Sequence, residues 1–232
     1  MDHFRQGDDW DGQPASQLTE TDFDVLKWGR IGRRQTVIST RCRRRPKPEE
    51  MVGTPMVLKS LLFADVKGSS KIEEDAIPIF VDRVLGGFAK SIAPFEDKVA
   101  YRETAGDGLY IAFTDIAAAA ECGLELIKSM QRIDFHGLPP LALRVSAHVG
   151  AVYSMRDPVT GYQKFFGGDI VRAARIEPIT PPGYVYVTEE FAAQLYLEAS
   201  ERFNCDYVGC LDSAKGYGSF RMYSLRHRYK GE

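Results

Sequence analysis

Two aspartates stand where strands are predicted to end. Asp65 closes the apolar run VLKSLLFADV (57–66) before the turn-like KGSS, and Asp107 lies between two glycines in VAYRETAGDGLYIAF. Alternation on both sides of Gly-Asp-Gly predicts a hairpin with Asp107 at its tip. If these strands are neighbours, the two carboxylates converge beside a turn that presents backbone N–H groups at a helix start. Such a site can hold a divalent metal and a phosphate chain, the latter through Gly68, Ser69 and Ser70.

Each aspartate also has a purely structural interpretation. Asp is favoured at helix caps and in turns, so Asp65 could cap the next helix and Asp107 could only shape the hairpin. His148 lies in an apolar strand and is predicted to be a core histidine bonded to backbone. The aromatic residues around these strands are predicted to pack; they are Tyr110, Phe165 and Phe166.

The elements that position these residues follow the order β-α-β-β-α-β. Periodicity predicts helices at 73–93 and at 115–132, the second capped by Asp115, and a central strand in LALRVSAHVGAVYS. A polar loop is predicted at 154–164, followed by a helix at 168–178, a strand at YVYVT, a helix at 189–199 and strands at 205–211 and 219–225. This order predicts an α+β, ferredoxin-like βαββαβ core with a C-terminal extension.

The chain has 232 residues, of which 44% are hydrophobic and 27% charged, so we expect one packed domain with an attached arm. The boundary is predicted after residue 54, with the domain at 55–232. The chain has no long apolar run and no signal-peptide pattern, which excludes membrane-spanning and secreted proteins from the expected classes. Its four cysteines match no zinc spacing and indicate reduced thiols in a cytoplasmic protein.

The net charge of −2 conceals an uneven distribution. Residues 27–47 hold nine Lys or Arg and no Asp or Glu, which leaves 21 basic and 32 acidic residues elsewhere, a net charge of −11. A basic segment can bind nucleic acid, but no aromatic residue interrupts RCRRRPKP. The segment is therefore interpreted as a solvated arm or as a contact for an acidic partner, and no nucleic acid or membrane partner is expected.

Four motifs taken together resemble the class III nucleotidyl cyclase catalytic domain. They are FADVKGSS, ETAGDGLYIAF, LRVSAHVGAVYS and FFGGDIVRAARIEPITPPG, in the order and at about the spacing of that family, from residue 57 to about 190. A weaker match continues through AKGYGSFRMYSL to residue 225. The resemblance implies the class III cyclase fold and an enzyme that cyclises a nucleoside triphosphate.

The resemblance implies roles for particular residues. The family's two metal-binding aspartates fall on Asp65 and Asp107, with the backbone carbonyl of Val66 reaching one of two Mn²⁺ or Mg²⁺ ions. Arg175 falls on the family's transition-state arginine, and Lys215 on a lysine that holds the terminal phosphates. Planar guanidinium, ammonium and metal ions suit the negative charge that develops as pyrophosphate leaves.

Two positions concern the choice of base. Glu103 stands where adenylate cyclases have a lysine and guanylate cyclases a glutamate, which disfavours ATP. Lys164 matches neither the aspartate nor the cysteine of those enzymes. A carboxylate accepts hydrogen bonds and an ammonium donates them, so the pair complements the edge of a base that offers both a donor and an acceptor. Uracil ranks first on this ground, with cytosine and guanine as alternatives. Phe165 or Tyr110 could line a pocket narrowed for a small base.

The family's ribose-orienting asparagine falls on Val171, next to Arg172, which could compensate. With altered residues at the base-reading and asparagine positions, the chain resembles the pyrimidine cyclases of bacterial Pycsar antiphage systems. This predicts UTP converted to cyclic UMP and pyrophosphate, a homodimer with two composite sites and a downstream effector. The alternatives are a guanylate or cytidylate cyclase, or a catalytically silent nucleotide-binding module.

Overall fold

The protein's structure is a computed structural model that describes residues 55–229, so the predicted arm at 1–54 lies outside the described residues. Within them, eight strands form one sheet of order β2-β3-β1-β4-β6-β8-β7, with β5 paired to β4. The strands are β1 (Met56–Lys67), β2 (Val99–Ala105), β3 (Gly108–Phe113), β4 (Ala142–Arg156), β5 (Gln163–Phe166), β6 (Val185–Thr188), β7 (Phe203–Asp212) and β8 (Ser219–His227). The order β2-β3-β1-β4 is that of a ferredoxin-like core, which confirms the predicted fold class.

The helices agree with the predicted periodicity. They are α2 (Ile77–Phe80), α3 (Gly86–Ile92), α4 (Ile116–Met130), α5 (Gly168–Ile176) and α6 (Glu189–Ala199). A π-helical stretch at 81–85 joins α2 and α3. The Asp115 carboxylate accepts from the Ala118 N–H at 2.7 Å, so the predicted cap of α4 forms. No helix among the described residues has the length and apolar character needed to cross a membrane.

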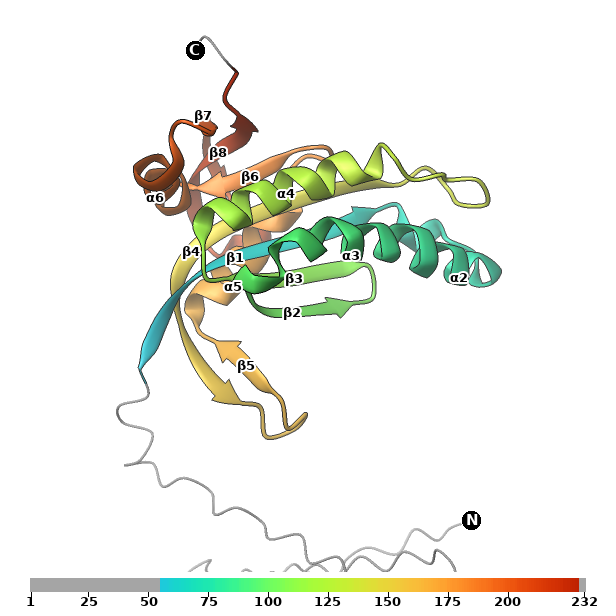
Figure 1. The fold of residues 1–232 in the computed structure, drawn as a ribbon, viewed down its shortest axis with the longest axis horizontal. Coiled ribbons are helices and arrows are strands. Elements are labelled where there is room, and N and C mark those ends of the chain that lie inside the picture. The colour runs from blue at the N-terminus through green and yellow to red at the C-terminus, as the bar shows by residue number, and fades with distance from the viewer. Residues whose placement is uncertain (1–54, 230–232) are drawn as a thin grey trace, which may run out of the picture. The chain divides into compact units, whose positions relative to one another are not determined.

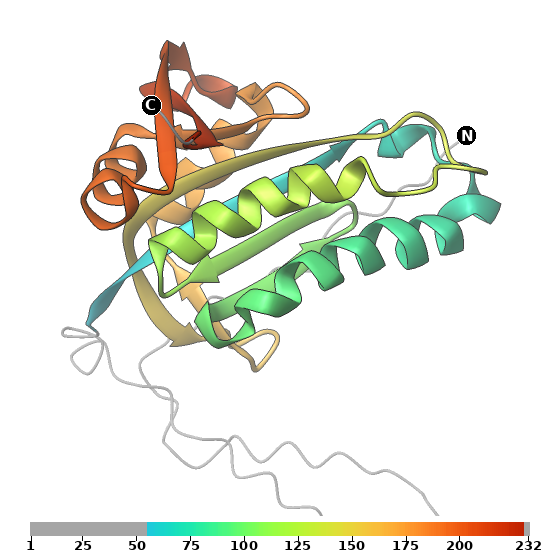
Figure 2. The same ribbon diagram turned by 45° about the horizontal axis from the view of Figure 1, so that its top comes forward.

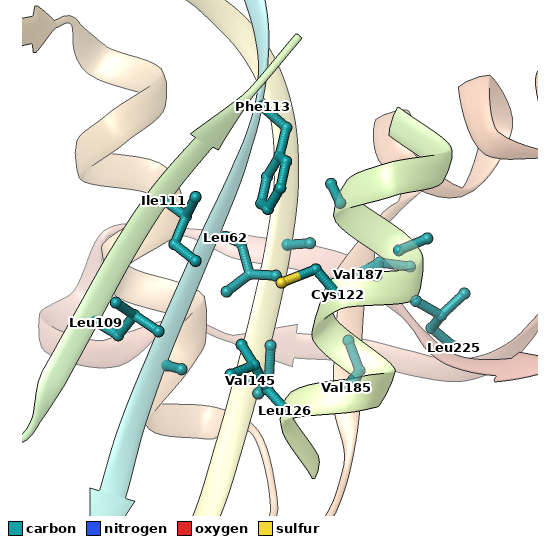
Figure 3. Packing of buried hydrophobic residues seen from close by; sticks show 14 of the residues in the cluster. Leu62, Leu109, Ile111, Phe113, Cys122, Leu126, Val145, Val185, Val187 and Leu225 are labelled. Atoms are coloured by element: carbon teal, nitrogen blue, oxygen red, sulfur yellow. The ribbon is translucent and has the colours of Figure 1, made fainter. Parts of the chain in front are cut away.

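The main core lies between the sheet and the helices α3, α4 and α6. Figures 1 and 2 show α3 and α4 side by side on the same face of the sheet. Leu62 of β1 and Cys122 of α4, both fully buried, point toward each other in this layer (Figure 3). A Cβ on Gly123 would lie 3.3 Å from Leu62, so the glycine allows α4 to approach the strands closely.

The opposite face of the sheet holds a smaller cluster. Its buried residues are Leu61, Tyr110, Ala112, Val152 and Ala173, the last on α5. Because side chains alternate along β1, Leu61, Phe63 and Asp65 point to this face while Leu62 and Val66 face the main core. The aspartate predicted to bind metal therefore belongs to the face that α5 partly covers.

One predicted loop was wrong. Residues 154–164 contain the end of β4 and the start of β5, which pair from Tyr153↔Phe166 to Arg156↔Gln163. The turn closes with hydrogen bonds between Asp157 and Gly161 and between Asp157 and Tyr162, each 2.8 Å. This hairpin leaves the body of the sheet (Figure 1), and its residues are exposed or only half-buried, so hydrophobic periodicity did not reveal it.

Candidate active site

The two predicted metal aspartates lie at neighbouring strand ends. Asp65 on β1 pairs in register with Gly108 on β3, and Asp107 directly precedes Gly108 in the tight turn between β2 and β3. Gly106, the other turn residue, has φ 65°, a conformation that costs glycine little. The hairpin thus brings both carboxylates to one edge of the fold, which we call the metal end.

Arg144, a residue outside the motifs quoted for the metal site, connects the metal end to the turn after α5. It is the β4 residue opposite Asp65, and its Nη2 donates to Asp65 Oδ2 at 2.7 Å. Its Nη1 donates to the Pro178 carbonyl at 3.2 Å, and its Nε forms an ion pair with Glu177 in the turn after α5. A lone arginine inside an apolar strand was the sequence signal that could have revealed it.

Glu177 has an unusual protonation equilibrium. The pKa of its carboxyl is raised to about 7: burial is the main cause, Asp65 and Asp107 add to it, and Arg144 opposes it. Three carboxylates and one guanidinium therefore share this region. Added positive charge at this site would favour the ionised form of Glu177.

The Gly-Ser-Ser turn follows β1 but differs from the predicted helix start. Ser69–Lys71 is a single 3₁₀ turn, capped by Gly68 at φ 97° without a side-chain hydrogen bond, and the long helix begins only at Ile77. Asp65 lies within β1, so it is not a helix cap. The Ser69 hydroxyl donates to the Asp107 carboxylate, which ties the turn to the metal end, and Ser70 lies in the same turn.

The donor set at the metal end suits a hard divalent cation. Asp65 and Asp107 supply carboxylate oxygens, and the predicted Val66 carbonyl follows directly in β1. No group of three or more His, Cys, Asp or Glu within residues 55–229 is arranged to hold a metal. Two carboxylates fit Mg²⁺ or Mn²⁺ because such ions keep several water or phosphate ligands.

Glu103 on β2 and Lys164 on β5 come together although 61 residues separate them. Lys164 Nζ lies 3.0 Å from Glu103 Oε2, and the Tyr101 hydroxyl donates to that same oxygen at 2.5 Å. Asp157 Oδ2 lies 3.8 Å from Lys164 Nζ. We call this group the base end. Tyr101 and Asp157 were not identified from the sequence.

The protonation equilibria at the base end favour the charged pair. Burial raises the pKa of Glu103, but hydrogen bonds from Tyr101 and Lys164 outweigh it, so the net pKa is lowered. The hydrogen bond to Glu103 raises the pKa of Lys164. Burial, reinforced by Glu103, raises the pKa of Tyr101. Hydrogen bonds from the backbone lower the pKa of Asp157 as well. Near neutral pH the base end therefore holds two carboxylates and one ammonium.

Aromatic rings surround the base end. The rings of Phe63 and Tyr110 stack with their centroids 4.6 Å apart. The rings of Tyr101 and Phe165 contact edge to face, with their centroids 6.2 Å apart. The Tyr110 hydroxyl is buried without a hydrogen-bond partner among the described residues, and burial raises its pKa. Phe165 packs against this cluster as expected. Phe166 is 40% exposed, so the prediction that it packs was wrong.

Within residues 55–229, neither of the two predicted phosphate-binding cations has an ion-pair partner. Arg175 is half-buried in the last turn of α5. Lys215 is exposed in the 3₁₀ turn Ala214–Gly216 between β7 and β8, at φ 60°. Val171 is 42% exposed on α5. Arg172 Nη1 lies 3.3 Å from Glu190 Oε1, and its Cζ lies 5.4 Å from the centroid of the Phe220 ring. The Arg172 side chain therefore already contacts other residues of the protein.

His148 is a core histidine, as predicted, but its partner is not backbone. The ring is 1% exposed, and Nδ1 lies 2.9 Å from the Thr188 hydroxyl at the start of α6. Burial lowers its pKa, against the opposing effect of Glu190 and Asp169. The histidine therefore links β4 to the end of β6 and lies outside the candidate site.

Comparison with protein families places this geometry in context. A model described as the adenylate and guanylate cyclase catalytic domain matches residues 56–227. Comparison with curated proteins gives no match.

Solved structures of cyclases share the fold. The guanylate cyclase domain of RhGC from Catenaria anguillulae, in complex with GTP, has a TM-score of 0.63 at 14% identity over 74% of this chain and 97% of that domain. The adenylyl cyclase CyaB from P. aeruginosa has a TM-score of 0.62 at 17% identity, over 76% and 98%. A dimeric guanylyl cyclase domain of RhoGC from the aquatic fungus Blastocladiella emersonii has a TM-score of 0.61 at 14% identity, over 74% and 97%.

Proposed function

Because the chain belongs to the adenylate and guanylate cyclase catalytic domain family, we propose that its domain at 55–232 cyclises UTP to 3′,5′-cyclic UMP and pyrophosphate. Family membership establishes a nucleotidyl cyclase domain. UTP is our further step, and it rests on one observation, the contact between Glu103 and Lys164 at 3.0 Å. The contact supports a base end that offers an acceptor and a donor side by side.

The chemistry of the bases decides among the triphosphates. Uracil presents N3–H between two carbonyls, so Glu103 can accept from the N–H while Lys164 donates to a carbonyl. A polar group that is buried by the bound base without a partner costs about 1–3 kcal/mol, which disfavours bases with a different pattern. Guanine also presents an N–H beside a carbonyl, so GTP is the second candidate.

The remaining residues supply charge and position for the reaction. The ribose 3′-oxygen attacks the α-phosphorus, the bond to the bridging oxygen breaks, and pyrophosphate leaves, so no protein nucleophile is needed. Two Mg²⁺ or Mn²⁺ ions bound by Asp65, Asp107 and the Val66 carbonyl would acidify the 3′-hydroxyl and neutralise the triphosphate. Arg175 and Lys215 donate to phosphoryl oxygens as negative charge develops there.

The turn after β1 is proposed to hold phosphate. Gly68, Ser69 and Ser70 lie directly beyond the metal aspartate, and Ser69 already contacts Asp107. Backbone N–H groups in such a turn bind phosphate oxygens without adding charge.

The active unit is proposed to be a homodimer. The chain has one set of metal aspartates and one set of base and phosphate residues, and in the resembled family a site combines the two sets from different domains. A head-to-tail dimer with two-fold symmetry then contains two equivalent sites. The Arg144 contacts to Asp65 and to the turn after α5 would connect the two sites within each subunit.

The physiological role we propose is a second-messenger synthase in cytoplasmic antiphage defence, acting through an effector that binds the cyclic nucleotide. This part rests on the resemblance to the Pycsar pyrimidine cyclases, noted at Glu103, Lys164 and Val171. The cyclic product, rather than a protein contact, would connect the enzyme to its effector.

Incubation of the full chain with Mn²⁺ and each of the four nucleoside triphosphates tests the proposal. We expect cyclic UMP as the main product by mass spectrometry. Cyclic GMP or cyclic CMP as the main product would overturn the base assignment but retain the cyclase. Absence of any cyclic product, with triphosphate binding retained, would support the silent nucleotide-binding module.

A further inference from the structure

Tyr101 has a defined position at the base end. It precedes Glu103 by two residues in β2, so both side chains point to the same face of the sheet. Its ring lies 5.5 Å from the Tyr110 ring and 6.2 Å from the Phe165 ring. Packing on two sides fixes the ring, and the fixed ring sets the position of the hydroxyl.

The two donors to Glu103 contact the same oxygen. Among the described residues, Tyr101 and Lys164 are the hydrogen-bond donors to this carboxylate, and both contact Oε2, at 2.5 and 3.0 Å. The other oxygen, Oε1, is therefore left for a ligand. The Glu103 side chain is 42% exposed, so a ligand can reach it.

We propose that Tyr101 is a positioning residue for base selection, which fixes the Glu103 carboxylate so that Oε1 accepts from a ring N–H beside a carbonyl. The inference rests on the proposed function and assigns a role to a residue that contacts Glu103 rather than the base. With the tyrosine hydroxyl present, the Glu103 carboxylate accepts hydrogen bonds from a neutral donor, Tyr101, and from the Lys164 ammonium. Without it, Lys164 is the remaining donor, and the carboxylate can rotate about its terminal torsion.

The consequence for selection follows from the pattern of the pyrimidines. Uracil has a ring N–H beside its 4-carbonyl, whereas cytosine has a ring nitrogen acceptor beside an exocyclic amino donor. A fixed Oε1 distinguishes the two bases because the ring position that carries a donor in uracil carries an acceptor in cytosine. A mobile carboxylate can follow the donor in either base, so discrimination between UTP and CTP falls.

Tyr101→Phe tests this, since it removes one hydroxyl and keeps the ring. We expect the ratio of kcat/KM for UTP to that for CTP to fall about five-fold or more, mainly through loss of UTP turnover. Tyr196→Phe is the matched control, because that tyrosine is 67% exposed on α6, away from the base end. The control should keep the wild-type ratio. An unchanged ratio in Tyr101→Phe would overturn the inference.

A double-mutant cycle separates positioning from a general structural effect. If Tyr101 acts through Glu103, then Tyr101→Phe should change the ratio little in a Glu103→Gln background. The acidic limb of the pH profile for UTP should also move to higher pH in Tyr101→Phe, because the lost hydrogen bond favoured the ionised carboxylate. Full additivity of the two substitutions would mean that Tyr101 acts independently.

The outcomes also distinguish this inference from the proposed function. If Glu103→Gln leaves base preference unchanged, the base assignment in the proposed function fails. If Glu103→Gln changes preference and Tyr101→Phe does not, only the positioning role fails. If the wild type binds triphosphates without cyclising them, the Kd values for UTP and CTP, measured calorimetrically with Ca²⁺, give the same ratio and decide the inference.

Discussion

The metal end and the base end of the candidate site are held in different ways. At the metal end, Arg144 already contacts the Asp65 carboxylate and Ser69 contacts that of Asp107. At the base end, both donors contact one oxygen of Glu103 and leave the other accessible. The metal end is thus occupied by the protein's own groups, while the base end is already arranged for a ligand.

This difference suggests how the two ends respond to ligands. Cation binding at the metal end supplies positive charge that competes with Arg144 and Ser69 for carboxylate oxygens, so contacts there must be shared or exchanged. Base binding at the other end requires no such exchange, and preorganised groups lose less entropy on binding. We therefore expect large, all-or-none effects at the metal end and graded effects on specificity at the base end.

Removal of either metal carboxylate should have the largest effect. Asp65→Ala and Asp107→Ala should each abolish turnover with every triphosphate and keep the fold, since both residues lie at strand ends outside the main core. Activity assays with Mn²⁺, together with circular dichroism, check this. Asp134→Ala is the control, because Asp134 is an exposed aspartate paired with Arg83 at 3.1 Å. Near-normal activity in either metal variant would contradict the metal assignment.

Mixing two inactive variants tests whether the two ends come from different subunits. Asp65→Ala and Arg175→Ala proteins, after subunit exchange, should form heterodimers with one intact site, and activity should return to about a quarter of the wild-type value for random pairing of equal amounts. Subunit exchange is verified by native mass spectrometry. If heterodimers form and activity stays absent, both ends of a site belong to one chain.

Replacement at the base end should change specificity rather than abolish activity. Glu103→Gln substitutes an amide for the carboxylate acceptor, and UTP turnover should fall by about ten-fold, equivalent to about 1.4 kcal/mol. Steady-state rates with all four triphosphates measure the change. Glu189→Gln, in an exposed ion pair with Arg221, makes the same chemical change outside the site and should have no effect. Unchanged preference in Glu103→Gln would transfer base selection to aromatic residues such as Phe165.

A smaller effect concerns the stability of the metal-free protein. The pKa of Glu177 is raised by burial to about 7 in the folded state, above its ordinary value. The folded state therefore keeps this proton to a higher pH than the unfolded state does. The contribution of the protonated carboxyl to the free energy of unfolding is fully present below about pH 4.5 and is lost as the pH rises toward 7.

Urea unfolding in EDTA measures this loss. Relative to Glu177→Gln, which does not titrate, the wild type should lose on the order of 2–3 kcal/mol between pH 5 and pH 7.5. Saturating Mn²⁺ should reduce the loss, since added positive charge favours the ionised carboxylate. Parallel pH dependence of the two proteins would mean that Glu177 titrates normally. That result would remove the proposed electrostatic difference between the two ends.

The sequence alone determined the local elements and the place of each aspartate at or near a strand end, whereas the pairing of β1 with β3 makes the two aspartates neighbours. A dense apolar run, a Gly-Asp-Gly turn and helical periodicity depend on neighbouring residues, so β1, the β2–β3 hairpin and α4 were predictable. The motif pattern likewise indicated the cyclase family before any fold was known. The β4–β5 hairpin escaped prediction because its residues are exposed or only half-buried, so hydrophobic alternation is weak there.

Only the tertiary structure decided which long side chains meet. Arg144 reaches Asp65 across 79 positions of sequence, and Lys164 reaches Glu103 across 61. Such contacts depend on the register between β1 and β4 and on the placement of β5 beside the edge of the sheet. Local patterns contain no information about either, and the orientation of Glu103 by Tyr101 is visible only once the rings of Tyr110 and Phe165 are packed around it.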